Sequence, residues 1–195
     1  MELVLASTSP WRRALLAQAG VPCRGVAHEV DERAVRISDP TELARELALR
    51  KARSVASRLP EAIVLGADQV VHLGERVFHK PEGPAEHLQM LRALRGQRHR
   101  LVTGVALLAR GTRVLFHEET FLRFRSDLAD AELEAIVASG EGAGCAGGYE
   151  IERRGAQLVE QVEGDWFNVV GLPVLRVITE LRRLGWRPSF EEDAG

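Results

Sequence analysis

The 195-residue sequence has little cysteine, no excess of either charge and no long apolar run. Its 2 cysteines, Cys23 and Cys145, form no C-x-x-C pair, which argues against a disulfide framework or a thiolate zinc site and indicates a reducing compartment. The formal net charge of -2 provides no global basic field to attract nucleic acid or a membrane. No stretch of about 18 apolar residues and no signal-peptide pattern is present, so we expect a cytoplasmic globular protein.

Several common nucleotide and metal motifs are also missing. No G-x-x-x-x-G-K-[ST] segment occurs, which excludes a P-loop. Residues 142–147 match G-x-G-x-x-G, but they follow a helical pattern and precede a strand pattern, the reverse of the order in a dinucleotide-binding fold. The 6 histidines show neither H-x-x-x-H nor H-x-H spacing, so no histidine-built zinc centre is expected.

Apolar runs alternate with helical repeats, which predicts an α/β fold in a single domain over residues 1–195. Helical patterns cover residues 10–18, 84–94, 130–138 and 173–185, and a longer one starts at Asp39-Pro40. The first helix is expected to bury Leu15, Leu16 and Ala19. Strand patterns cover residues 3–6, 23–30, 62–66 and 76–78, with hairpins at 99–108 and 113–124 and at 149–153 and 157–162. Residues 190–195 are expected to form a disordered tail.

The first strand pattern leads directly into a helix at residues 7–13. Ser9 suits the N-cap and Pro10 the first helical position. The Ser7 hydroxyl and the free N–H groups of the first turn are then expected to face the same space as Arg12 and Arg13, which suits a phosphate group. A strand, loop and helix with two solvated arginines fits the same residues equally well.

More polar residues follow other apolar patterns. Asp68 comes shortly after the buried strand at 62–66, where an open α/β sheet places its chemistry. Lys51 lies beside the apolar stripe of the long helix, where a snorkelling lysine is the alternative. Polyphosphate hydrolysis with Mg²⁺ or Mn²⁺ needs both anion-binding groups and carboxylates. The candidate anion binders are Ser7, Arg12, Arg13, Lys51 and Lys80, and the candidate acids are Glu32 and Asp68.

Together these segments resemble the Maf family, which was named for septum-formation inhibition and comprises nucleoside triphosphate pyrophosphatases. The motifs lie in the family's order, over nearly the whole chain, at residues 5–13, 30–32, 51–52, 66–69, 80–81, 103–104, 146–149 and 168–173. The resemblance implies a mixed twisted sheet with flanking helices, in two lobes around a cleft, similar to the inosine triphosphate pyrophosphatases. It also implies a homodimer.

The family's reaction is a metal-dependent attack of water on the α-phosphate, which releases a nucleoside monophosphate and pyrophosphate. Carried over by position, the catalytic residues would be Asp68 as proton acceptor, Glu32 and Lys80. Glu32 and Asp68 would hold the divalent metal cation, Mg or Mn. The substrate-binding residues would be Ser7, Arg12, Arg13 and Lys51.

Substrate choice is expected to depend on Trp11, Gln69 and Glu152. The dTTP/UTP branch of the family has Arg, Thr and Gln there, so this chain resembles the 7-methyl-GTP branch. A carboxylate at position 152 can accept both N1–H and N2–H of guanine. The positive charge of the methylated purine favours stacking on the Trp11 indole, while Gln69 can meet the remaining base edge. We therefore expect hydrolysis of 7-methyl-GTP to 7-methyl-GMP and diphosphate, with dTTP/UTP hydrolysis as the alternative.

Two other classes fit the sequence less well than a hydrolase. A non-catalytic nucleotide-binding regulator of cell division would have no need of Asp68. A nucleotidyltransferase would need an acceptor substrate and a glycine-rich first turn, whereas residues 7–10 contain no glycine.

Overall fold

The computed structural model describes residues 1–188, so the expected tail at 190–195 lies outside the described residues. The expected α/β class is confirmed by a seven-stranded mixed sheet flanked by helices. The strand order is β2-β1-β3-β5-β6-β7, and β4 pairs with β3. The strands are β1 (Leu3–Leu5), β2 (Arg24–Gly25), β3 (Ile63–Leu73), β4 (Arg76–Phe78), β5 (Arg98–Ala109), β6 (Thr112–Phe124) and β7 (Val159–Gly164).

One edge of β3 is shared by two strands that do not meet. β1 runs parallel to β3 and pairs with residues 63–65, while β4 runs antiparallel and pairs with residues 71–73. The other edge of β3 pairs with β5 throughout residues 64–72. Within residues 1–188, therefore, no strand covers residues 66–70 on the edge opposite β5.

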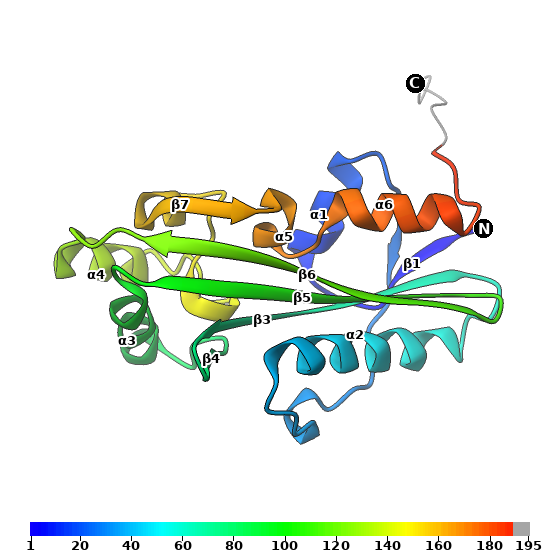
Figure 1. Ribbon diagram of the computed structural model, residues 1–195, viewed down its shortest axis with the longest axis horizontal. Helices are drawn as coiled ribbons and strands as arrows, with labels where there is room; N and C mark the ends of the chain where they lie inside the picture. Colours follow the sequence, from blue (N-terminus) through cyan, green and yellow to red (C-terminus); the bar gives the residue numbers. More distant parts are fainter. Residues whose placement is uncertain (189–195) are drawn as a thin grey trace.

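The helices lie on both faces of the sheet (Figure 1). Helix α2 runs along one side of β3 and β5, helices α1, α5 and α6 lie on the other side, and α3 and α4 gather at one end. The helices are α1 (Pro10–Gln18), α2 (Pro40–Ala56), α3 (Pro84–Leu94), α4 (Asp130–Ala138), α5 (Trp166–Val170) and α6 (Val174–Arg183). Three short 3₁₀ turns cover Glu32–Ala34, Ala146–Gly148 and Arg154–Leu158. Over residues 1–188, every helix is too short or too polar to cross a membrane.

The apolar side chains of residues 1–188 form four clusters, and the two largest define the two lobes of the structure. One joins α1 and α6 to the sheet through Leu16 and Leu181. The other joins α3 and α4 to the sheet through Leu91 and Leu133. The open edge of β3 lies between β1, which belongs to the first cluster, and β4, which belongs to the second.

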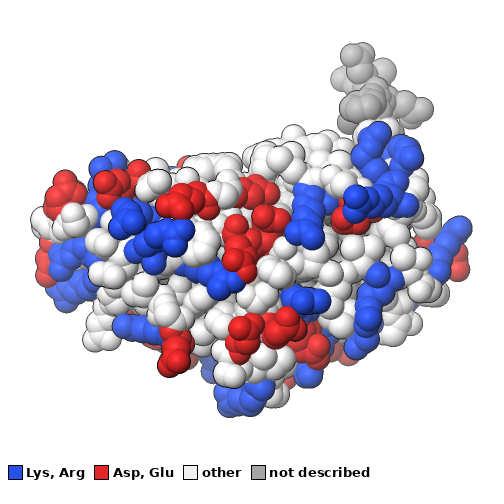
Figure 2. Space-filling model, in the orientation of Figure 1, with Lys and Arg blue, Asp and Glu red and all other residues white. Residues whose placement is uncertain are grey.

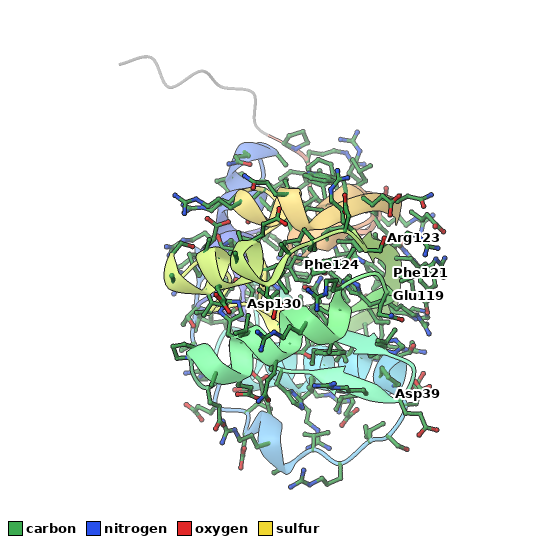
Figure 3. The ribbon with its side chains drawn as sticks, turned by 90° about the vertical axis from the view of Figure 1, so that its left-hand side faces the viewer. Asp39, Glu119, Phe121, Arg123, Phe124 and Asp130 are labelled. Carbon is green, nitrogen blue, oxygen red and sulfur yellow. The ribbon has the colours of Figure 1, made fainter. Side chains whose placement is uncertain are left out.

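Strand β6 shows the alternation that separates core from surface. Phe124 is fully buried, whereas Glu119, Phe121 and Arg123 follow one another along the strand on the opposite face (Figure 3). The Arg98 guanidinium covers the Phe121 ring at 3.8 Å. On the face shown in Figure 2, acidic and basic side chains are interspersed, in agreement with the net charge of -2.

Helix α2 lies directly on the sheet because two strand residues lack a side chain. A Cβ atom on Gly66 would lie 2.2 Å from the Ala48 carbonyl oxygen, and one on Gly104 would lie 2.2 Å from the Ala44 carbonyl oxygen. Both contacts are with helix backbone, which cannot rotate away as a side chain can. The two glycines therefore set the distance between α2 and the strands β3 and β5.

Several expectations about the elements are confirmed. The bounds of α1, α3 and α4 are those predicted, and β5 and β6 form the expected antiparallel pair. The strand at 62–66 is wrong in length, because β5 pairs with β3 well beyond Gly66 and carries the strand on to Leu73. Asp68 consequently lies in the middle of a strand rather than beyond its end.

Other expectations are wrong. The strand at 23–30 shortens to Arg24–Gly25, because only that part pairs with β1. The hairpin at 149–153 and 157–162 does not form, since its first half folds back closely enough for a Cβ on Gly155 to lie 2.4 Å from the Glu150 carbonyl oxygen. Ala19 follows the last residue of α1 and is exposed. Helix α5 was not expected; its N-cap Asp165 accepts hydrogen bonds from the backbone of the first turn.

We predict that Gly104→Ala lowers the free energy of unfolding by about 2–3 kcal/mol, because the new methyl group must push α2 away from β5. Urea unfolding measures this change. Gly83→Ala is the matched control, since its backbone is extended (φ 177°) and no atom of the part of the chain described here approaches within 4 Å of the new Cβ. The control should lose about 1 kcal/mol or less. Equal losses in the two variants would contradict the close approach of α2.

Candidate active site

Arg12 occupies the open edge of β3. The Ala6 N–H donates to the Leu65 carbonyl at 2.8 Å, and the next carbonyl on that edge, Ala67, accepts from Arg12 Nη1 at 2.9 Å. Arg12 Nε donates to the Gly171 carbonyl at 2.9 Å. Burial lowers the pKa of Arg12, while the charge of nearby Asp68 opposes that effect. The guanidinium thus joins α1, β3 and the C-cap of α5, and it brings a half-buried positive charge close to Asp68.

At the junction between β1 and α1, the N-cap and the first helical position are those predicted, but Arg12 and Arg13 do not face the same space. The Ser9 hydroxyl accepts from the Arg12 N–H at 3.4 Å, and Pro10 begins the helix. The buried Ser7 hydroxyl accepts from the Ser9 N–H at 3.1 Å. Arg13 is exposed, and its charge acts on Cys23, whose pKa is raised by burial. Ser7 and Arg12 therefore face inward, whereas Arg13 stands at the surface beside β2.

Lys51 binds two carboxylates. Its Nζ lies 2.6 Å from Asp68 Oδ1 and 2.8 Å from Glu32 Oε1. The whole lysine residue is 4% exposed and Asp68 is 7% exposed. The lysine beside the apolar stripe of α2 is therefore a buried ion-pair partner, not a surface residue with a snorkelling side chain.

The two carboxylates differ in acidity. Burial raises the pKa of Asp68 above its ordinary value, although the charges of Lys51 and Arg12 act in the opposite direction. Burial also acts to raise the pKa of Glu32, but Lys51, His28 and Arg12 outweigh it, so this pKa is lowered. A carboxylate with a raised pKa accepts protons better near neutral pH. Asp68 thus has the environment of a general base, while Glu32 remains ionised.

Glu32 and Asp68 provide hard oxygen donors of the kind that Mg²⁺ and Mn²⁺ prefer. Their Oε1 and Oδ1 atoms meet at the same lysine ammonium, so the two carboxylates are close together. Within residues 1–188 no group of three or more His, Cys, Asp or Glu side chains could hold a metal ion. The donor set therefore fits a hydrated cation completed by phosphate oxygens of a substrate, and not a cage built from protein alone.

The glycine-rich segment 140–148 lies close to the chain around Lys80 and to Glu152. The Gly147 N–H donates to the His79 carbonyl at 3.3 Å, which ties this segment to the chain that leads into Lys80. Burial raises the pKa of Cys145 to about 12, with Glu152 acting in the same direction and Lys80 in the opposite one. Lys80 and Glu152 are thus both close enough to act on Cys145.

Trp11 packs against the same glycine-rich segment. A Cβ atom on Gly144 would lie 3.1 Å from the Trp11 Cη2 atom. Trp11 belongs to α1, so this contact links the lobe of α1 and α6 to the lobe of α3 and α4. Glu152 is exposed as a residue, but its carboxyl group is partly shielded from water, and this shielding together with the charge of Glu150 raises its pKa.

Gln69 is hydrogen-bonded within the protein. Its Nε2 donates to Thr103 Oγ1 at 3.0 Å and to the Asn168 carbonyl at 2.6 Å. A side-chain amide has two N–H donors, and both are used here. Reading of a nucleobase by Gln69 therefore stays a prediction, and it would have to use the amide oxygen.

The sequence alone assigned no catalytic or binding role to three residues around the site. His28 lies beside the acidic pair, with Nε2 3.6 Å from Glu32 Oε1 and Nδ1 accepting from the Val30 N–H at 3.3 Å. Thr103 and Asn168 are fully buried polar residues that contact Gln69. Both belong to segments that carry the family resemblance, but only the fold shows what they contact.

The comparison with known families decides the classification. Residues 2–184 match the model of the family described as "Maf-like protein". The chain belongs to the Maf family. The expected enzyme class, a hydrolase that releases pyrophosphate from nucleoside triphosphates, is confirmed.

Similar Maf proteins cover almost the whole chain. A protein of Symbiobacterium thermophilum is 44% identical over 194 residues, which are 100% of this chain and 99% of the relative. Relatives from Geobacillus sp. and Bacillus cereus are each 41% identical and cover 95% and 93% of this chain, or 99% and 95% of their own lengths. All three are named "dTTP/UTP pyrophosphatase". These names do not support the 7-methyl-GTP branch expected from Trp11, Gln69 and Glu152.

We predict that Lys51→Met lowers the free energy of unfolding by about 3–5 kcal/mol, because it leaves Asp68 buried without its counter-charge. Adding Asp68→Asn should recover part of this loss, since the amide carries no charge. Urea unfolding of the single and double variants measures both effects. Lys80→Met, at an exposed position, should change stability by about 0.5 kcal/mol or less. A Lys51→Met protein as stable as the Lys80→Met control would contradict the buried ion pair.

Proposed function

We propose that this Maf protein hydrolyses dTTP and UTP to the nucleoside monophosphates and pyrophosphate. Support for the substrates comes from the names of relatives that are 41–44% identical and match nearly the full chain. Support for the chemistry comes from one observation above all. Asp68, a buried carboxylate with a raised pKa, contacts the Lys51 ammonium and lies near the positive charge of Arg12, which binds the neighbouring Ala67 carbonyl.

The proposed reaction uses this arrangement directly. Asp68 accepts a proton from the water that attacks the α-phosphorus, so the new P–O bond forms as the bond to the bridging oxygen of the β-phosphate breaks. Lys51 and Arg12 stabilise negative charge near the reacting group. The surface cations Arg13 and Lys80 hold the outer phosphates as pyrophosphate leaves.

A divalent cation, Mg or Mn, is part of the proposal. Glu32 and Asp68 would hold it, and when bound it would neutralise charge on the non-bridging phosphate oxygens. Titrating the protein with Mn²⁺ under calorimetry, with and without Glu32→Gln, measures this binding apart from catalysis.

7-Methyl-GTP hydrolysis is the second candidate, because Trp11 and Glu152 have the chemistry to stack on and hydrogen-bond with a methylated guanine. Two observations count against it. Both amide protons of Gln69 are used within the protein, and Trp11 packs on the segment around Gly144. If guanine is nevertheless the base, Glu152→Gln should weaken its selection over dTTP.

The decisive assay is pyrophosphate release with Mg²⁺ or Mn²⁺ from dTTP, UTP, CTP, GTP and 7-methyl-GTP, with no acceptor molecule present. We expect the highest kcat/KM for dTTP and UTP. Asp68→Asn should abolish turnover while nucleotide binding remains measurable, whereas Asp130→Asn, at an exposed position on α4, should behave as wild type.

Other results of this assay would overturn parts of the proposal. Preference for 7-methyl-GTP would show that the proposed substrates dTTP and UTP are wrong, while the proposed hydrolysis at the α-phosphorus would still stand. Wild-type turnover by Asp68→Asn would remove the assigned base. No release from any nucleotide would favour a nucleotide-binding regulator. The homodimer implied by the family resemblance stays a prediction that analytical ultracentrifugation tests.

A further inference from the structure

The two neighbours of Asp68 in the chain are both anchored to the same segment. Ala67, on one side, accepts a hydrogen bond from Arg12, which also binds the Gly171 carbonyl. Gln69, on the other side, donates to the Asn168 carbonyl. Residues 168–171 form the end of α5 and its C-cap, so the contacts close a ring that runs from β3 through Arg12 and α5 back to β3.

Helix α5 is itself fixed to the sheet by buried hydrogen bonds. Asn168 Nδ2 donates to Thr120 Oγ1 at 3.0 Å and to the Glu118 carbonyl at 3.4 Å, both on β6. Thr120 Oγ1 donates in turn to the Asp165 carbonyl at 3.1 Å. Asn168 and Thr120 are both 0% exposed. A helix of 5 residues has little stability of its own, so these bonds determine its position.

The end of α5 has the geometry that the ring requires. Gly171 adopts φ 128°, a conformation that strongly favours glycine. This turn directs its carbonyl to Arg12 Nε at 2.9 Å. On the other side of the ring, Thr103 is 0% exposed and holds the second amide proton of Gln69 at 3.0 Å. The hydrogen bonds of Arg12 and Gln69 that form and support the ring are therefore all shielded in part from solvent.

We propose that this ring positions Asp68, and that Gln69, Thr103 and Asn168 are positioning residues. The inference rests on the proposed function, because it concerns the base assigned there. Asp68 lies on a stretch of β3 where, among residues 1–188, one edge has no neighbouring strand. The ring replaces the missing strand and holds the peptide groups on both sides of the carboxylate. A displacement of about 1 Å at a reacting group can cost 100-fold in rate, so such a restraint matters for catalysis.

This role differs from the reading of the base by Gln69. A base-reading residue would change the preference among nucleotides when it is replaced. A positioning residue for Asp68 lowers kcat for every nucleotide by a similar factor and leaves the preference unchanged. Thr103 separates the two roles further, because its buried hydroxyl reaches Gln69 and not the solvent.

The test compares Gln69→Met, which has similar length and no N–H donor, with Thr103→Val and Thr103→Ser. We expect Gln69→Met and Thr103→Val to lower kcat about 10- to 100-fold for dTTP and UTP alike, with KM changed less than about 3-fold. Thr103→Ser keeps the hydroxyl and should retain nearly wild-type kcat. The double variant Gln69→Met with Thr103→Val should fall no further than Gln69→Met alone, because both remove the same hydrogen bond.

A matched control separates positioning from loss of stability. Ile136→Val removes one buried methyl group on α4, in the other lobe, and should cost about 0.5–1.5 kcal/mol with unchanged kcat. The ring is contradicted if Gln69→Met alters nucleotide preference, or if Thr103→Val loses no more kcat than Ile136→Val. If Gln69→Met fails to fold, the comparison of Thr103→Val with Thr103→Ser still tests the ring, because equal kcat values in these two variants would contradict it.

Amide hydrogen exchange keeps this inference distinct from the proposed function. Thr103→Val should speed exchange at residues 66–70 and 166–171 relative to Thr103→Ser, whether or not the protein hydrolyses dTTP. Unchanged exchange would overturn the ring, and absence of wild-type pyrophosphate release would instead overturn the proposed function.

Discussion

The buried ion pair between Lys51 and Asp68 is the interaction on which the site depends. Taking two charges out of water is costly, and the contact of 2.6 Å offsets that cost only if the helix carrying the lysine is held in place. Gly66 and Gly104 provide this by letting the backbone of α2 rest directly on β3 and β5. The close packing of α2 on the sheet therefore also holds Lys51 in contact with Asp68.

A second constraint is the gap between β1 and β4 along β3. It exposes one edge of the strand beside Asp68, and Arg12 uses that edge by binding the Ala67 carbonyl. Within residues 1–188 this edge has no strand partner, and the Arg12 guanidinium that fills it places positive charge beside Asp68. The pKa of Asp68 is raised and that of Glu32 is lowered, so Asp68 is suited to accept a proton while Glu32 stays ionised.

The sequence predicted what local patterns determine. Ser9, Pro10 and the apolar spacing determined α1, and the long alternating runs determined the β5–β6 pair. The sequence could not show that Lys51 is buried, because the residues near Lys51 along α2 do not reveal which carboxylates contact the lysine in the fold. Asp68 was expected beyond a strand end, since pairing with β5 is a long-range contact with no local signal. Substrate choice was inferred from three side chains, whereas the full-length relatives favour another nucleotide.

The central claim is that water activated beside Asp68 attacks the α-phosphorus. Hydrolysis of dTTP in H₂¹⁸O, followed by mass spectrometry of both products, tests it most directly. The account predicts that ¹⁸O appears in the nucleoside monophosphate and that the pyrophosphate is unlabelled. Label in the pyrophosphate would place the attack on the β-phosphorus and contradict the assigned geometry.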